Sequence, residues 1–97
     1  MKKNGFIEII GIEPVSNKDV VLYTHAPWLR SFSTGTLVFF KIGEKFFHNP
    51  IPIMDIKPDG AILWRVGSIE GSSDLCNVNI GDNVYGSISE FKNGGFS

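Results

Sequence analysis

The stretch His48-Asn49-Pro50-Ile51-Pro52-Ile53-Met54-Asp55-Ile56 places two prolines one residue apart in a run that otherwise has the composition of a strand. Because proline has no backbone N–H, neither Pro50 nor Pro52 can donate a hydrogen bond to a neighbouring strand. We therefore expect this segment to lie at the edge of a sheet, or to line a site where a ligand takes the place of a neighbouring strand.

Short strand-like runs lie on both sides of the proline stretch. With it they predict six strands, the other five falling at 6–13, 19–24, 36–42, 61–66 and 84–89. Gly11 interrupts the first run and predicts a bulge or bend. Lys57-Pro58-Asp59-Gly60 is a strong turn sequence. Gly71-Ser72-Ser73-Asp74-Leu75 predicts the start of one short helix. The pattern indicates an all-β fold, a small six-stranded antiparallel Greek-key barrel with one short helix.

Composition narrows the functional class. The 97 residues are expected to form one domain, 1–97, and the net charge of −1 gives no electrostatic reason to expect nucleic acid as a partner. No apolar run approaches membrane-spanning length, and Glu8 and Glu13 interrupt the run that a signal peptide would need. Cys76 is the single cysteine, which excludes an intrachain disulfide and fits a reduced, cytoplasmic setting.

Most chemically suggestive residues have a structural interpretation. His25 and His48 lack cysteine or carboxylate partners at metal-ligand spacing, so no metal site and no catalytic residue is predicted. Cys76 is expected to be a small buried hydrophobe. The bulky aromatic residues are assigned to the core rather than to a surface that stacks bases: Trp28, Phe32, Phe39, Phe40, Phe46, Phe47 and Trp64. Gly71-Ser72 is usually a helix cap, but it would also suit a phosphate.

The order of these signals resembles the FAD-binding β-barrel of ferredoxin-reductase-like flavoproteins. Ala26-Pro27 and Thr34-Gly35-Thr36-Leu37-Val38 resemble the "aP…PGQFv" entry to the third strand of that family, and Pro50 to Asp55 resembles its "RPISIHD" strand. Four later segments match "lYRV", "GTeLL", "pGDkv" and "GnGF" in order, namely 63–66, 71–75, 80–84 and 94–96. The resemblance runs from about Phe6 to Ser97 and is closest to the electron-transfer subunit of dihydroorotate dehydrogenase.

The resemblance implies FAD as cofactor and assigns roles to individual positions. In that family an arginine before the proline contacts the phosphate region, and a Ser or Thr two residues after the proline approaches the ring nitrogens. A Gly-Ser or Gly-Thr pair receives the pyrophosphate. The corresponding cofactor-binding positions here are Asn49 for the arginine, Pro50, Ile51 alongside the ring, Pro52 for the hydroxyl, Ile53, and Gly71 with Ser72 for the phosphates.

Two positions depart from the family pattern. Asn49 lacks the charged fork of an arginine, and Pro52 removes both a hydroxyl and a backbone donor. The 97 residues also contain neither the nicotinamide-binding domain nor the cysteine cluster of the family. Two hypotheses follow. The chain is a flavin-binding barrel whose redox partner proteins supply and accept the electrons, or it is a degenerate barrel that binds no flavin and acts as an interaction or structural module.

Overall fold

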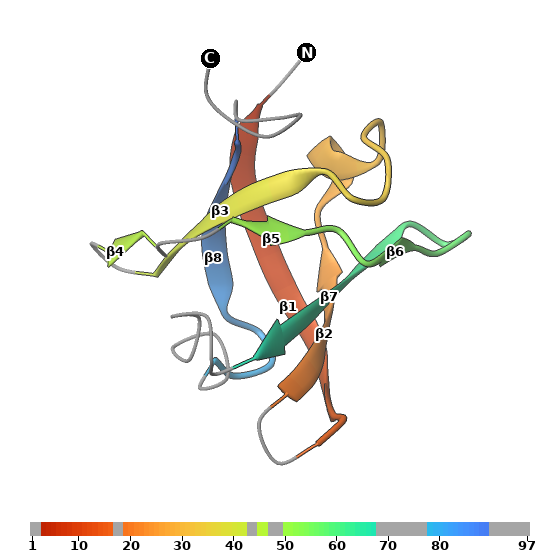
Figure 1. Ribbon diagram of the computed structural model, residues 1–97, viewed down its shortest axis with the longest axis vertical. Coiled ribbons are helices and arrows are strands. Elements are labelled where there is room, and N and C mark those ends of the chain that lie inside the picture. The colour runs from red at the N-terminus through yellow and green to blue at the C-terminus, as the bar shows by residue number, and fades with distance from the viewer. Residues whose placement is uncertain (1–2, 17–18, 43–44, 47–49, 68–77, 90–97) are drawn as a thin grey trace.

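The computed structural model describes residues 3–16, 19–42, 45–46, 50–67 and 78–89 (Figure 1). Short strands and one turn of 3-10 helix make up its regular structure. The elements are β1 (Asn4–Pro14), β2 (Asp19–His25), η1 (Pro27–Leu29), β3 (Leu37–Ile42), β4 (Lys45–Phe46), β5 (Ile51–Pro52), β6 (Asp55–Ile56), β7 (Ala61–Gly67) and β8 (Asn83–Ile88).

Alternating burial explains why the longest strand forms. Along the first half of β1, Gly5, Ile7 and Ile9 are buried, whereas the residues between them are exposed. This period of two gives the sheet one face toward the core and one toward solvent. The pairing of β1 with β2 shifts register between Ile9 and Gly11, which confirms the predicted bulge.

The strands form one antiparallel sheet in the order β4-β3-β8-β1-β2-β7-β6, and β5 pairs with β3 off this path. β5 and β6 lie on the same proline stretch, and β6 pairs with β7. The stretch therefore reaches from β3 to β7 and joins two distant parts of the sheet. Figure 1 shows the resulting curl, with β3 and β5 crossing in front of β8 and β1.

The core lies inside this curl. Phe40 on β3 and Trp64 on β7 are both fully buried and meet edge to face, with their ring centroids 4.7 Å apart. Trp64 also donates from Nε1 to Thr24 Oγ1 at 2.8 Å, and that hydroxyl donates to the carbonyl of Ile62 at 2.7 Å. The buried Thr24 hydroxyl therefore both donates and accepts a hydrogen bond.

Trp28 packs over a pair of glycines on two neighbouring strands. Gly5 and Gly86 are register partners, and a Cβ atom added to either would lie within 3.3 Å of the Trp28 indole. The indole Nε1 donates to the carbonyl of Phe6 at 2.9 Å. Two glycines thus make room for a half-buried tryptophan that ties the η1 segment to β1.

The structure confirms an all-β antiparallel fold and corrects its details. Eight strands are described instead of six, because the proline stretch divides into β5 and β6 and because β4 adds a short hairpin strand to β3. In the described ranges η1 is the one helical element, and the predicted helix beginning at Gly71 lies outside them.

The aromatic residues assigned to the core divide into three groups. Phe40 and Trp64 are fully buried, and Trp28 and Phe32 are partly buried against the core. Phe39 is half-buried but alternates with Phe40, so it lies on the outward side of β3. The side chains of Phe46 and Phe47 lie outside the described part of the chain, as does Cys76.

Candidate functional site

The proline stretch changes hydrogen-bonding partner in its middle. Ile53 N–H donates to the carbonyl of Thr36 and its own carbonyl accepts from Gly35 N–H, both at 2.9 Å. The next residue, Met54, donates instead to the carbonyl of Leu63 on β7 at 2.8 Å. Both prolines precede this change of partner. They lie in the half of the stretch next to β3, where Pro52 is the register partner of Leu37. The first part of the segment is thus hydrogen-bonded toward β3 and the second part to β7, so the segment is not a free sheet edge along its whole length.

Side chains of the stretch point alternately inward and outward. Ile51 and Ile53 are buried in the core, at 7% and 2% exposure. Pro52 and Met54 are exposed, and Met54 keeps 43% of its surface in contact with solvent. A ligand lying on this segment from outside would therefore meet the Pro52 ring, the Met54 thioether and the backbone, and it would not meet the side chains of Ile51 and Ile53.

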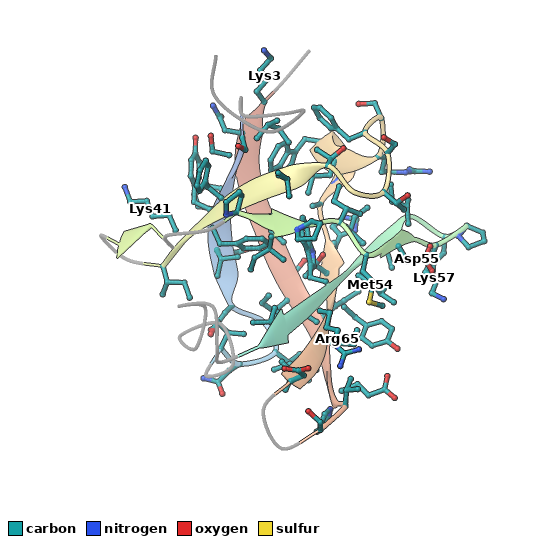
Figure 2. The ribbon with its side chains drawn as sticks, viewed as in Figure 1. Lys3, Lys41, Met54, Asp55, Lys57 and Arg65 are labelled. Carbon is teal, nitrogen blue, oxygen red and sulfur yellow. The ribbon has the colours of Figure 1, made fainter. Side chains whose placement is uncertain are left out.

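The outward side of β7 continues this surface. Ile62, Trp64 and Val66 belong to the core cluster, so the alternation places Leu63 and Arg65 on the opposite side. Leu63 is nevertheless only 3% exposed, because its register partners Tyr23 and Asp55 flank it. In Figure 2 Met54 and Arg65 appear near each other, beside β7.

Charged groups on this surface occur in pairs. Arg65 donates from Nη2 and Nε to Asp19 Oδ2, at 2.8 and 3.3 Å. Lys57 Nζ lies 3.4 Å from Asp55 Oδ2, and both side chains are nearly half exposed. A guanidinium has five N–H groups, so one carboxylate does not exhaust the donors of Arg65. The surface can therefore offer a charged donor to a carbonyl or phosphate oxygen.

A tyrosine next to this surface has a shifted pKa. Tyr23 Oη donates to Glu13 Oε1 at 2.8 Å. This hydrogen bond and the negative charge of Glu13 both favour the neutral phenol, so they raise the pKa of Tyr23 above its ordinary value of 10.0. Tyr23 is therefore a neutral hydrogen-bonding group at physiological pH, and not a base.

The predicted cofactor-binding residues are only partly placed by the structure. Pro50, Ile51, Pro52 and Ile53 lie together on the stretch, whereas Asn49, Gly71 and Ser72 fall outside the described residues. The predicted turn at Lys57 to Gly60 is confirmed by the Gly60 N–H donating to the Lys57 carbonyl at 2.8 Å, with Gly60 at φ +96°.

Metal and membrane signals were searched over the same residues. Among the described residues, no three His, Cys, Asp or Glu side chains gather in a way that could hold a metal ion. His25 is exposed at the end of β2, and His48 lies outside the described ranges. No helix in the described part of the chain has the length and apolar character needed to cross a membrane.

Sequence reasoning missed a groove on another part of the sheet. A groove with a volume of about 470 Å³ is lined by Phe6 of β1, Lys41 of β3, and Asn83 and Tyr85 of β8. The signal that could have revealed it is the alternation of β1, which puts Phe6 on the side opposite Ile7 and Ile9. Phe6 and Tyr85 were not singled out because aromatic residues in a small barrel were assigned to its core.

No known family model matches the sequence, and no curated protein matches it either. Solved structures do resemble the fold, and among them is one described as that of an NADH-dependent reduced ferredoxin–NADP oxidoreductase in work on flavin-based electron bifurcation. It matches 79% of this chain with a TM-score of 0.69 and 21% sequence identity. The match spans 29% of the other chain, so this chain corresponds to less than a third of that protein. The chain therefore has a ferredoxin-reductase-like fold.

The described residues supply part of what a flavin needs. Pro52 and Met54 provide exposed apolar surface for a flat ring, and Arg65 provides N–H donors beside it. No buried side-chain nitrogen or oxygen atom in the described ranges lacks a hydrogen-bond partner, so the interior holds no polar group waiting for a ligand. Among the described residues, the exposed groups that could meet a flavin beside the proline stretch are therefore Pro52, Met54 and Arg65.

Proposed function

We propose that this chain is a flavin-binding barrel related to electron-transfer subunits of oxidoreductases, with FAD as its cofactor. The observation that carries the proposal is the proline stretch, which runs from β3 to β7 in a ferredoxin-reductase-like fold and exposes Pro52 and Met54. A bound flavin supplies the redox chemistry, and the chain supplies binding and orientation. The closer relationship to the dihydroorotate dehydrogenase subunit, the redox partner protein and the cytoplasmic location belong to the same proposal.

Within this proposal, Arg65 takes over the charged role that Asn49 cannot fill. Its side chain is 56% exposed, and it lies on the outward side of the strand to which the proline stretch pairs. Charge-assisted hydrogen bonds are about twice as strong as neutral ones, so an arginine here compensates for an asparagine at position 49. Asn49, Gly71 and Ser72 remain the expected contacts of the phosphate region.

The test begins with the purified protein and its visible spectrum, followed by titration with FAD and FMN through quenching of flavin fluorescence. We expect quenching by FAD at micromolar concentration. A colourless protein that quenches neither flavin at high micromolar concentration would contradict the proposal.

Variants then locate the site. Arg65→Gln should weaken FAD binding by about tenfold, the value of one charge-assisted hydrogen bond, whereas Lys3→Gln, which removes a cation just before β1, should leave it unchanged. Pro52→Ser combined with Asn49→Arg restores the family pattern and should tighten binding. Equal losses for Arg65→Gln and Lys3→Gln would mean that only overall charge matters, and would contradict a flavin site on β7.

A second function, an interaction module without flavin, is favoured by one specific observation. Arg65 is already held by Asp19 at 2.8 Å, and Lys57 lies 3.4 Å from Asp55, so a ligand must compete with existing ion pairs. Under this alternative the double variant at positions 49 and 52 gives no gain in flavin binding.

A further inference from the structure

The groove on the outward side of β1, β8 and β3 has two different walls. Phe6 on β1 and Lys41 on β3 flank β8, because Tyr85 is the register partner of both residues. Asn83 lies two residues before Tyr85 on the same side of β8. β8 therefore forms the floor of the groove, with an aromatic wall on one side and a cationic wall on the other.

The aromatic wall is open to solvent and well anchored. Phe6 is 66% exposed, and its ring meets that of Tyr85 edge to face, with centroids 5.5 Å apart and planes at 80°. An edge-to-face neighbour covers at most one face of a ring, so at least one face of Phe6 is not covered by Tyr85. The backbone beneath is fixed by the hydrogen bond from Trp28 Nε1 to the Phe6 carbonyl. This wall can therefore stack a flat ring without rearranging.

The two ends of the groove differ in charge. Of the described residues that line it, Lys41 is the one that carries a charge. Glu8 is the register partner of Asn83 and follows Phe6 on the outward side of β1, so negative charge lies at the opposite corner. An anionic group is attracted toward β3 and repelled from the β1 end.

We propose that this groove binds a planar aromatic ring that carries an anionic group, with the ring against Phe6 and the anion toward Lys41. Its volume of about 470 Å³ is in the range of small-molecule sites, roughly 300–1,000 Å³. The Asn83 amide offers both a donor and an acceptor to the edge of such a ring. The groove uses other side chains than Pro52, Met54 and Arg65, so the inference stands independently of the flavin proposal.

The probes are AMP, which combines ring and charge, adenosine, which keeps the ring, and inorganic phosphate, which keeps the charge. Amide chemical shifts of the isotope-labelled full chain are followed by NMR during each titration. We expect AMP to shift the signals of Phe6, Lys41, Asn83 and Tyr85, and to bind at least about tenfold more tightly than either fragment. Adenosine that binds as tightly as AMP, or AMP shifts that avoid these residues, would overturn the proposal.

Matched variants separate the two walls. Phe6→Leu and Lys41→Gln should each weaken AMP about tenfold, whereas Phe6→Tyr, which keeps a ring, should bind normally. Ile80→Ala removes an apolar side chain of the same 66% exposure elsewhere, and Lys57→Gln removes a cation from the other surface, so neither should change AMP binding. If Ile80→Ala weakened AMP binding as much as Phe6→Leu, or Lys57→Gln as much as Lys41→Gln, the assignment of the two walls would be overturned.

The same spectra distinguish this site from the flavin surface. AMP shifts confined to residues 50–56 and β7 would overturn the groove and leave the flavin proposal standing. Loss of AMP binding in Lys41→Gln with FAD quenching retained would support a separate site.

Discussion

Two outward surfaces of the sheet use their polar and aromatic groups in opposite ways. On the β2–β7–β6 surface polar groups bind one another, as in the Arg65–Asp19 pair and the hydrogen bond from Tyr23 to Glu13. On the β1–β8–β3 surface an exposed Phe6 leans on Tyr85 beside an open groove. A ligand competes with existing ion pairs on the first surface, whereas on the second it can stack on the exposed ring of Phe6. Ligand affinity is thus expected to respond to different kinds of substitution on the two surfaces.

The interior next to β2 and β7 contains a buried hydrogen-bond chain, whereas the interior next to β1 and β8 is held by close packing. Thr24→Val tests the hydrogen-bond chain and has the largest expected effect. The Thr24 hydroxyl accepts from Trp64 Nε1 and donates to the Ile62 carbonyl, and all three residues are fully buried. Valine keeps the shape but leaves the buried Trp64 indole N–H without its acceptor, so we expect the free energy of unfolding to fall by about 2–3 kcal/mol. Urea denaturation followed by circular dichroism measures this loss.

Thr24→Ser is the matched control for that change. It keeps the hydroxyl and removes one methyl group, so it should cost about 1 kcal/mol and preserve the position of the Trp64 indole N–H signal in the NMR spectrum. If valine and serine destabilise the protein equally, the hydrogen-bond chain does not contribute as described.

The second prediction addresses the β1–β8 side, where close packing replaces polar bonding. An alanine Cβ at Gly86 would lie 2.6 Å from Ile7 Cδ1, 3.2 Å from Val38 Cγ1 and 3.3 Å from Trp28 Cζ2. The Ile7 methyl can move, but three neighbours must yield together, so Gly86→Ala should cost about 1–2 kcal/mol. It should also shift the Trp28 indole N–H signal and leave that of Trp64 in place.

Ser87→Ala, at the adjacent outward position of β8, should change stability by less than about 0.5 kcal/mol. Together with Thr24→Val, this pair tests whether each tryptophan reports on its own side of the sheet. A Gly86→Ala protein in which only the Trp64 signal moves would break the comparison.

Local patterns predicted the fold class, and long-range pairing decided the rest. The bulge at Gly11 and the turn at Gly60 were predictable, because a glycine in a strand or after Pro-Asp has a local meaning. The partner change between Ile53 and Met54 was not predictable, since it depends on β3 and β7 approaching the stretch from different directions. The count of six strands failed for the same reason.

For the candidate site, the sequence located the proline stretch but could not say which of its sides faces outward. Burial of Ile51 and Ile53 shows that the outward side belongs to Pro52 and Met54. Arg65 appeared in the sequence as part of a family-like motif, but its place on the outward side of the strand that pairs with β6 depends on long-range pairing. Composition alone also hid the groove, because an aromatic residue can occupy either side of a strand.

The smallest effect concerns Tyr23, where the polar pairing of the β2–β7–β6 surface can be measured directly. Its hydrogen bond to Glu13, and then the negative charge of Glu13, raise the pKa above 10.0. In a Tyr85→Phe background, ultraviolet titration follows Tyr23 alone. Glu13→Ala should lower the pKa of Tyr23 toward 10.0, whereas Glu8→Ala on the same strand should leave it in place.

The same shift fixes the direction of the pH dependence. Because the pKa of Tyr23 is higher in the folded than in the unfolded chain, the hydrogen bond stabilises the fold fully below pH 10. This contribution is lost as the pH rises through the folded pKa, since the phenolate has no proton to donate and is repelled by Glu13. Between neutral pH and strongly alkaline pH, the parent chain should therefore lose more stability than Glu13→Ala. Equal losses of stability in the two proteins would show that the hydrogen bond from Tyr23 to Glu13 does not persist in solution. One of the polar pairs that distinguish this surface from the aromatic one would then be absent.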